Sequence, residues 1–237
     1  MPCIRKIPNT KLRNKDVFMN ILVMARSSFI IGLLFLSVFS AQNSHAKPGH
    51  DWVKILGTPP EDSSVEEQED YNTLMNYQVT RTDEECELAS KEEKVSLKNF
   101  FGGKDGPLTK KEVRKLRPFF LKYFLKAGIP SMKAKNHFKR PRPFVKFEEI
   151  EPCVKRPAGK SFPSGHASVS RIMAYALSFK FPKRAKKFFK RANAIAKNRM
   201  LGGVHYPSDI RAGKKLADYL AAKFFKNKKF MNELLGN

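Results

Sequence analysis

Apolar residues recur every three or four positions over most of the chain beyond Tyr71, a spacing that predicts amphipathic helices. The pattern covers residues 84–101, a stretch from 109 onward, and then 167–181, 183–200 and 209–235. Local signals bound the helices: Thr109-Lys-Lys-Glu112 resembles a capping box, and Gly128-Ile-Pro130 is expected to end that helix. Strand alternation is scarce. The sequence therefore predicts an all-α fold, a helical bundle that places side chains from facing helices in one interior pocket.

The start of the chain predicts a secretory leader. Residues 24–46 contain an arginine, an apolar run at 29–39 and small residues up to Ala46, where a signal peptidase would cut. The apolar run is shorter than the ~20 residues that span a bilayer. We therefore interpret residues 1–46 as an N-terminal extension with a cleaved signal peptide. No later segment is apolar for long enough, so we expect no stable membrane span after cleavage.

The distribution of charge separates residues 47–70 from the rest of the chain. Residues 47–70 are rich in proline and acidic side chains, and we interpret them as a flexible, solvated acidic segment before a catalytic domain at 71–237. The net charge is +24, and about +19 remains beyond the leader, because residues 1–46 hold six Lys or Arg and one Asp. Such an excess attracts any anion, so it names no partner, and we expect no specific binding of nucleic acid.

Cys86 and Cys153 are the two cysteines that remain when Cys3 is removed with the leader. Two leftover thiols in an oxidising compartment are usually paired. Neither belongs to a close pair of cysteines typical of a metal site, and neither neighbours a candidate catalytic histidine. We predict a Cys86–Cys153 disulfide.

Three distant segments carry side chains suited to a phosphate ester. Arginine forks and lysine ammonium groups match phosphate oxygens, and the first turn of a helix offers free backbone N–H groups to an anion. A carboxylate on one nitrogen of a histidine fixes its tautomer and leaves the other nitrogen as a nucleophile, while a second histidine serves as acid and base. The candidates are Lys135 and Arg142 in the first segment, Pro163-Ser164-Gly165-His166 in the second, and Arg199, His205 and Asp209 in the third.

Each candidate also has an ordinary structural interpretation. Among 46 Lys and Arg residues, most are solvated surface charges, and Ser164 alone would be a helix cap. Asp209 could be a charge at a helix N-terminus, beside a histidine in a loop. What favours the functional interpretation is that the segments occur together. The few histidines and the lack of paired aspartates argue against a zinc or two-metal phosphatase, and we expect no metal and no cofactor.

The order and spacing of these residues resemble a known signature. Lys135-x6-Arg142-Pro143, Pro163-Ser-Gly-His166 and Arg199-x5-His205-x3-Asp209 are similar to the three motifs of the phosphatidic acid phosphatase type 2 and vanadium haloperoxidase superfamily. With the leader and the phrase Gly-Gly-Val-His-Tyr-Pro-Ser-Asp, the chain looks like a bacterial class A non-specific acid phosphatase.

The resemblance implies an activity and roles for single residues. It implies a fold of the same helical type and a metal-independent enzyme that hydrolyses phosphate monoesters through a phosphohistidine. A periplasmic or secreted location, inhibition by vanadate and often a homodimer are implied as well. The roles are His205 as nucleophile, Asp209 as its partner, His166 as general acid, and Lys135, Arg142, Ser164, Gly165 and Arg199 as ligands of the substrate phosphate.

Two departures and three alternatives stand beside this interpretation. Asn198 occupies the position where the family usually has a serine. Lys133-x6-Arg140-Pro141 satisfies the first motif in a second register, although Arg142-Pro-Phe144 aligns as the family has it. A lipid or isoprenoid phosphatase of the same superfamily is the main alternative. A vanadate-dependent haloperoxidase and a basic anion-binding protein with a decayed active site are the others.

Overall fold

A computed structural model describes residues 51–104 and 106–236, so the leader predicted at 1–46 lies outside the described residues. Within these ranges the chain is helical and contains no strand, which confirms the predicted all-α class. No helix in the same ranges is both long and apolar enough to cross a membrane. The elements are α2 (Asp51–Leu56), α3 (Val65–Thr80), α4 (Asp83–Lys91), α5 (Leu97–Phe101), α6 (Lys110–Phe138), α7 (Pro143–Lys146), α8 (Gly165–Lys180), a 3-10 turn (Pro182–Arg184), α9 (Ala185–Leu201), α10 (Pro207–Lys226) and α11 (Lys228–Leu235).

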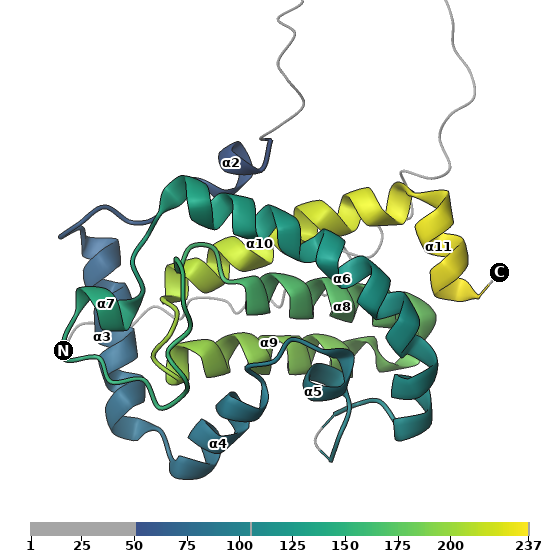
Figure 1. Cartoon of the computed structure of the whole chain (residues 1–237), viewed down its shortest axis with the longest axis horizontal. Coiled ribbons are helices and arrows are strands. Elements are labelled where there is room, and N and C mark those ends of the chain that lie inside the picture. The colour runs from purple at the N-terminus through teal and green to yellow at the C-terminus, as the bar shows by residue number, and fades with distance from the viewer. Residues whose placement is uncertain (1–50, 105, 237) are drawn as a thin grey trace, which may run out of the picture. The chain divides into compact units, whose positions relative to one another are not determined.

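Helix α8 is the central element, with α6, α9 and α10 packed along it (Figure 1). Small side chains let its neighbours approach closely, and Met173 and Leu177 are fully buried against Phe188 of α9. Burial of each such side chain contributes about 1.5–3 kcal/mol. The packing therefore holds the N-terminal end of α8, where the Pro-Ser-Gly-His segment lies, in a defined position.

The close approach of α10 to the start of α8 requires a glycine. A Cβ atom at Gly213 would lie 2.5 Å from the backbone oxygen of Ser164 and 3.0 Å from the Cβ of Ala167. The backbone N–H of Ser164 also donates to the carbonyl of Asp209 at 2.9 Å. These contacts join the second and third motif segments through the backbone.

The predicted stop at Gly128-Ile-Pro130 is wrong, because α6 continues through Pro130 to Phe138. Proline removes one helical hydrogen bond, but the helix beyond it is held by tertiary packing. Ala127 and Ala134, on either side of the proline, are buried in the cluster that joins α6 to α8 and α10. The helix ends at Lys139, which adopts a left-handed φ of 54°.

Two other predicted helices are divided by polar caps. The stretch 84–101 forms α4 and α5, since Ser96 Oγ accepts a hydrogen bond from the N–H of Asn99 at 3.0 Å and starts a new helix. The stretch 209–235 forms α10 and α11, since Asn227 Oδ1 accepts from the N–H of Phe230 at 2.9 Å. Apolar periodicity continues across both caps, so it hides the breaks.

The expectation that residues 47–70 form a flexible, solvated acidic segment is wrong at Glu67 and Asp70, which are buried on a helix. Helix α3 begins at Val65 with Ser64 as its N-cap. Glu67 and Asp70 are buried, and Asp70 is only 1% exposed. A run of acidic residues is usually solvated, but these two carboxylates have cationic partners far away in the sequence.

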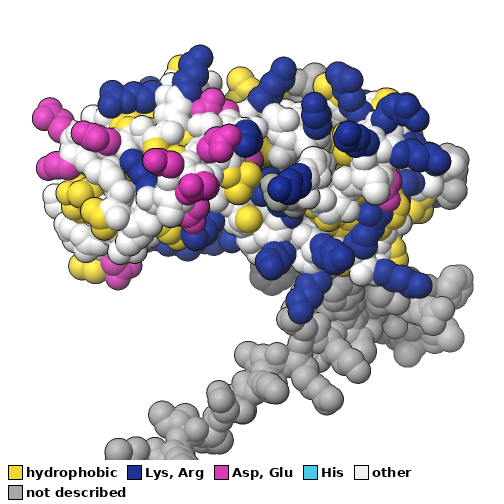
Figure 2. Space-filling model, turned by 90° about the horizontal axis from the view of Figure 1, so that it is seen from below, with side chains coloured by type: hydrophobic (Ala, Val, Ile, Leu, Met, Phe, Trp, Pro, Cys, Tyr) yellow, Lys and Arg dark blue, Asp and Glu magenta, His cyan; other side chains and the backbone are white. Residues whose placement is uncertain are grey.

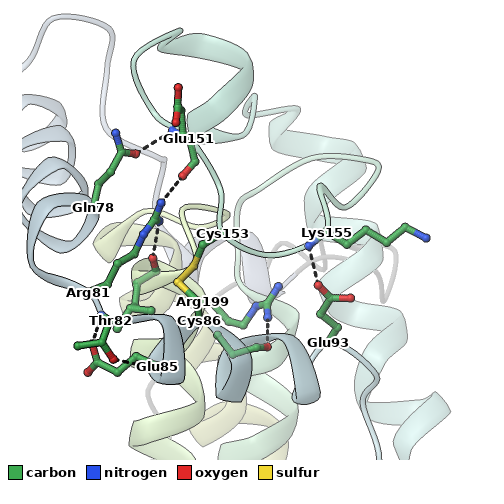
Figure 3. The surroundings of a disulfide bond; sticks show 12 residues. Gln78, Arg81, Thr82, Glu85, Cys86, Glu93, Glu151, Cys153, Lys155 and Arg199 are labelled. Atoms are coloured by element: carbon green, nitrogen blue, oxygen red, sulfur yellow. Dashed lines mark hydrogen bonds between the residues drawn. A yellow bond between two sulfur atoms is a disulfide. The ribbon is translucent and has the colours of Figure 1, made fainter.

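The predicted disulfide is present between Cys86 of α4 and Cys153 in the segment that leads from α7 to α8 (Figure 3). Hydrogen bonds from α3 hold the same segment. Gln78 Oε1 accepts from the N–H of Glu151 at 2.7 Å, and Arg81 Nη2 donates to the carbonyl of Glu151, also at 2.7 Å. This segment is therefore anchored to both α3 and α4.

Removal of the disulfide in a Cys86→Ala/Cys153→Ala variant should lower the free energy of unfolding by about 4 kcal/mol, because the bond joins residues with a sequence separation of 67. Urea denaturation of the variant and of the oxidised wild type measures the difference. The wild type treated with reductant should match the variant. Equal stability of the oxidised and reduced wild type would contradict the bond.

Candidate active site

The three predicted segments meet at one cleft of about 440 Å³. Arg142, His166, Arg199 and His205 all line it. Arg142 is the N-cap of α7, His166 lies in the first turn of α8, Arg199 lies in the last turn of α9, and His205 precedes α10. The residues come together because the ends of four helices meet here.

The two nitrogens of the His205 ring have different partners, and these partners define the tautomer. Nδ1 lies 3.0 Å from Asp209 Oδ2, an acceptor, and Nε2 lies 3.3 Å from Nη1 of Arg142, a donor. A proton on Nδ1 satisfies both contacts. The lone pair of the neutral ring is then on Nε2, the nitrogen next to the arginine of the cleft.

Local sequence explains why His205 and Asp209 face each other. Gly203 has a φ of 73°, which turns the chain after α9, and Pro207 begins α10 at its first position. The Asp209 side chain reaches back to accept from the N–H of Tyr206 at 3.0 Å. A carboxylate near a helix N-terminus is favoured by the helix dipole as well.

Burial lowers the pKa of His205 well below its ordinary value, and the charges of Lys135, Arg142 and Arg199 lower the pKa further. The residue is 3% exposed, so solvent screens these charges little. His205 is therefore neutral in the free protein, the state in which the Nε2 lone pair is available.

Arg140 is a residue of this site that the preferred motif register leaves out. Its Nη1 donates to Asp209 Oδ1 at 2.9 Å, and its Nη2 donates to Asp70 Oδ2 at 3.1 Å. Its guanidinium also lies 3.7 Å from the centre of the Tyr206 ring. Burial raises the pKa of the Asp209 carboxyl, whereas Arg140 and the N–H of Tyr206 stabilise the ionised form. Arg140 thus balances the buried carboxylate behind His205.

Asp70 and Ser208 complete this buried network. Asp70 Oδ1 accepts from the N–H of Ser208 at 3.0 Å, and the Ser208 hydroxyl lies between Asp70 and Arg140, 2.7 Å from Arg140 Nη1. Helix α3 is therefore connected to the first turn of α10. The sequence contained one signal for Arg140, which is the arginine of the second Lys-x6-Arg-Pro register. It contained no signal for Asp70.

His166 is held by backbone carbonyls. Its Nε2 lies 3.1 Å from the carbonyl oxygen of Glu92 and 3.0 Å from that of Glu93, so Nε2 carries a proton and the lone pair of the neutral ring is on Nδ1. Burial lowers the pKa of His166 to about 3, with Arg199 as the next cause. The Asn198 amide donates to the Glu92 carboxylate at 3.0 Å, so Asn198 supports the segment that holds His166.

Three cations act on His205, of which Arg142 and Arg199 line the cleft and Lys135 does not. Lys135 Nζ donates to the carbonyls of Lys160 at 2.6 Å and Ser161 at 2.8 Å, and burial, with the charge of Arg142, lowers its pKa to about 7. Burial likewise lowers the pKa of Arg142 to about 10. Arg199 Nη1 donates to the carbonyl of Ala89 at 3.1 Å, while its buried Nε has no hydrogen-bond partner in the described residues. An anion in the cleft would give such a donor its acceptor.

Ser164 and Gly165 form the start of α8. The Ser164 hydroxyl accepts from the N–H of Ala167 at 3.3 Å, as a helix N-cap does. A Cβ atom at Gly165 would lie 3.5 Å from Ser131 Oγ, an ordinary contact. The fold alone therefore accounts for Ser164 and does not require glycine at 165.

Two properties of the described residues, their potential metal ligands and their distribution of charge, bear on which ligands the protein can bind. Within residues 51–104 and 106–236, no three His, Cys, Asp or Glu side chains gather as metal ligands would. Positive charge is concentrated in the C-terminal part: residues 106–236 hold thirty-three Lys or Arg and seven Asp or Glu, whereas residues 51–104 hold six and thirteen. Figure 2 shows most of the acidic side chains of one face toward one end, with Lys and Arg side chains spread over the rest. The cleft and the basic part both suit anions.

Comparison with known proteins agrees with the motifs. Residues 110–228, half of the chain, match the PAP2 superfamily, and the chain belongs to this superfamily. A non-specific acid phosphatase of Providencia stuartii is 27% identical over 194 residues, 78% of each chain. A non-specific acid phosphatase of Salmonella typhi is 33% identical over 102 residues, 40% of each chain.

The fold is shared more widely. The crystal structure of a bacterial vanadium-dependent iodoperoxidase aligns with a TM-score of 0.51 at 16% sequence identity, over 72% of this chain and 52% of that chain. Identity this low shows likeness of fold alone. The predicted helical bundle of the superfamily is thereby confirmed.

Substitution Arg140→Leu should lower the free energy of unfolding by about 3–5 kcal/mol, because it leaves the carboxylates of Asp70 and Asp209 buried without their counter-ion. Thermal denaturation at neutral pH measures the loss. Arg114→Leu is the matched control, since Arg114 lies exposed on α6. If the two variants are equally stable, the buried ion pair does not contribute as described.

Proposed function

We propose that this protein is a secreted acid phosphatase that hydrolyses phosphate monoesters through a phosphohistidine on His205 and needs no metal. The observation that carries this proposal is the pairing of His205 with Asp209 and Arg142, which presents an Nε2 lone pair beside a buried arginine. The names of the curated relatives and membership of the PAP2 superfamily support the same activity.

In the first step, Nε2 of His205 attacks phosphorus in line with the ester oxygen. The nitrogen–phosphorus bond forms as the bond to the ester oxygen breaks, and His166 donates a proton from Nδ1 to the departing alkoxide. Phosphate oxygens replace Nε2 as the acceptor of the Arg142 N–H and accept from the unpartnered Nε of Arg199. The carboxylate of Asp209 stabilises the positive charge that develops on His205.

In the second step, water attacks the phosphohistidine. His166, now neutral, takes a proton from the water at Nδ1, and the nitrogen–phosphorus bond breaks to release phosphate and neutral His205. Lys135, Arg142 and Arg199 stabilise the equatorial oxygens in both steps, and Ser164 and Gly165 contribute donors from the start of α8. Charge stabilisation of this kind replaces a metal ion.

The shifted pKa values give a reason for acidic working conditions. His166 must be protonated to act as an acid, yet burial and, after it, the charges of Arg199 and Arg142 lower its pKa to about 3 in the free protein. A bound phosphate dianion offsets those charges, so substrate binding raises the pKa of His166 and takes up a proton. Protons are more available for this at low pH.

A periplasmic or secreted location is part of the proposal. The leader pattern before residue 47 supports it, and so does the Cys86–Cys153 disulfide, since disulfides persist in oxidising compartments. Inhibition by vanadate and assembly into a homodimer remain predictions from the family resemblance. Activity measured after dialysis against a chelator tests the metal-free mechanism.

Substitution His205→Ala should reduce turnover of phenyl phosphate to background, and Asp209→Asn should reduce kcat by roughly 10⁴-fold, because the amide no longer holds the productive tautomer. Steady-state kinetics measure both effects. His137→Ala, at an exposed histidine of α6, serves as the control and should retain wild-type activity. Substantial activity in a folded His205→Ala variant would rule out the mechanism.

Anion binding should weaken as the pH rises through 7. The pKa of Lys135 is lowered to about 7, so the ammonium is present below that pH and is lost above it. Sulfate is a suitable probe because its charge is constant in this range. Between about pH 6 and pH 8.5 its affinity should fall by up to about tenfold per unit above pH 7.

Isothermal titration calorimetry at constant ionic strength measures this dependence. Lys135→Arg keeps the charge at all these pH values, and its sulfate affinity should change much less. A wild-type affinity that is constant from pH 6 to 8.5 would show that Lys135 does not contact the anion.

A further inference from the structure

The cleft has a second wall that the proposed chemistry does not use. Besides the four motif residues, it is lined by Glu93 and by the run Lys155-Arg156-Pro157-Ala158. Glu93 follows α4, and the run follows Cys153 in the segment between α7 and α8. Neither part belongs to the three motifs, so this wall is where the chain can set its own substrate preference.

This second wall is anchored on both sides. The Cys86–Cys153 disulfide fixes the segment two residues before Lys155, and the N–H of Lys155 donates to Glu93 Oε1 at 2.7 Å (Figure 3). Pro157 restricts the backbone further. The wall therefore has a defined position relative to α4, and its two cationic side chains extend from a fixed base.

The charge of the second wall is positive. Lys155 and Arg156 are exposed. The Arg156 guanidinium lies 5.4 Å from the centre of the ring of Phe144, the residue that follows Arg142-Pro143 in the sequence. Among the described residues that line the cleft, Glu93 is the single acidic one, and one of its carboxylate oxygens is bound to the Lys155 backbone. A second anion would be attracted to Lys155 and Arg156.

Geometry places the leaving group near this wall. In-line attack by His205 puts the ester oxygen on the side of phosphorus away from Nε2, and the proton donor His166 must lie on that side. His166 is bound to the carbonyl of Glu93, which is part of the second wall. The volume of about 440 Å³ lies in the range of ligand pockets, so it holds more than a phosphate group.

We propose that Lys155 and Arg156 form a second anion subsite, and that the preferred substrates are phosphate monoesters whose leaving group carries a further negative charge, a carboxylate or a second phosphate. This inference rests on the proposed phosphatase function and narrows its substrate class. The scissile phosphate is held by the motif cations, and the leaving-group anion by the two cations of the second wall.

The test compares 4-carboxyphenyl phosphate with phenyl phosphate, which differ by one carboxylate. The ratio of their kcat/KM values should fall by roughly two- to fivefold in each of Lys155→Ala and Arg156→Ala, and further in the double variant. Comparison of ratios between variants cancels the different intrinsic reactivities of the two esters. Phosphocholine, whose leaving group is cationic, should be hydrolysed faster by the double variant than by the wild type.

Lys160→Ala is the matched control, because Lys160 is exposed on the same segment and its side chain does not line the cleft. Its ratio should equal that of the wild type, and inhibition by inorganic phosphate should be the same in every variant. An unchanged ratio in the double variant would overturn the subsite, and so would an equal fall in Lys160→Ala.

Binding separates failure of the subsite from failure of the proposed function. Calorimetric affinities of the two esters for His205→Ala, with and without the double substitution, require no turnover. If the wild type hydrolyses neither ester but Lys155 and Arg156 still favour the carboxylated one, the phosphatase function fails and the subsite stands. Hydrolysis without any charge preference in kinetics or binding leaves the function and overturns the subsite.

Discussion

The carboxylate of Asp209 is fully buried, and the geometry of the site depends on how its charge is balanced. One oxygen accepts from His205 Nδ1 and from the N–H of Tyr206, and the other accepts from Arg140. A buried carboxylate without partners would take up a proton and could no longer orient the imidazole. Arg140 favours its ionised form and joins it to Asp70, so the packing of α3 is coupled to the orientation of the His205 ring.

The cations around the cleft act on the histidines in two states. Without an anion, burial lowers the pKa of His205 below its ordinary value, and the charges of Lys135, Arg142 and Arg199 lower it further, which keeps the ring neutral. With a phosphate dianion bound, the same charges are offset, and a proton on His166 is no longer opposed to the same degree. In the proposed mechanism, His205 is therefore neutral and able to attack before substrate binds, and His166 gains its proton once the phosphate is bound.

Local rules predicted the parts of the fold that depend on neighbouring residues. The N-cap at Ser164 and the capping box at Thr109 both follow from side chains within three positions of a helix end. The same rules failed at Pro130, where burial of Ala127 and Ala134 holds α6 together across the proline. A local signal cannot include the packing energy of a distant helix.

The sequence likewise predicted part of the candidate site but not all of it. Residue type and spacing pointed to the four motif residues that line the cleft, and the structure brings these together. The ion pairs of Arg140 with Asp70 and Asp209 were not predictable. Asp70 and Arg140 are seventy positions apart, and Asp70 lies in a run of acidic residues, a pattern that usually indicates a solvated segment. The contact of Asn198 with Glu92, 106 positions away, is of the same kind. Long-range ion pairs leave no periodic pattern in a sequence.

The central claim is that the phosphoryl group is transferred to His205, and trapping of the intermediate tests it most directly. A His166→Ala variant mixed with an activated aryl phosphate should accumulate phosphoryl-enzyme, because the aryl leaving group needs little acid assistance while hydrolysis of the intermediate lacks its base. Quenching in alkaline denaturant, in which phosphohistidine is stable, followed by peptide mass spectrometry should place one phosphoryl group on His205. A phosphoryl group on another residue, or rapid turnover with none trapped on His205, would contradict the account.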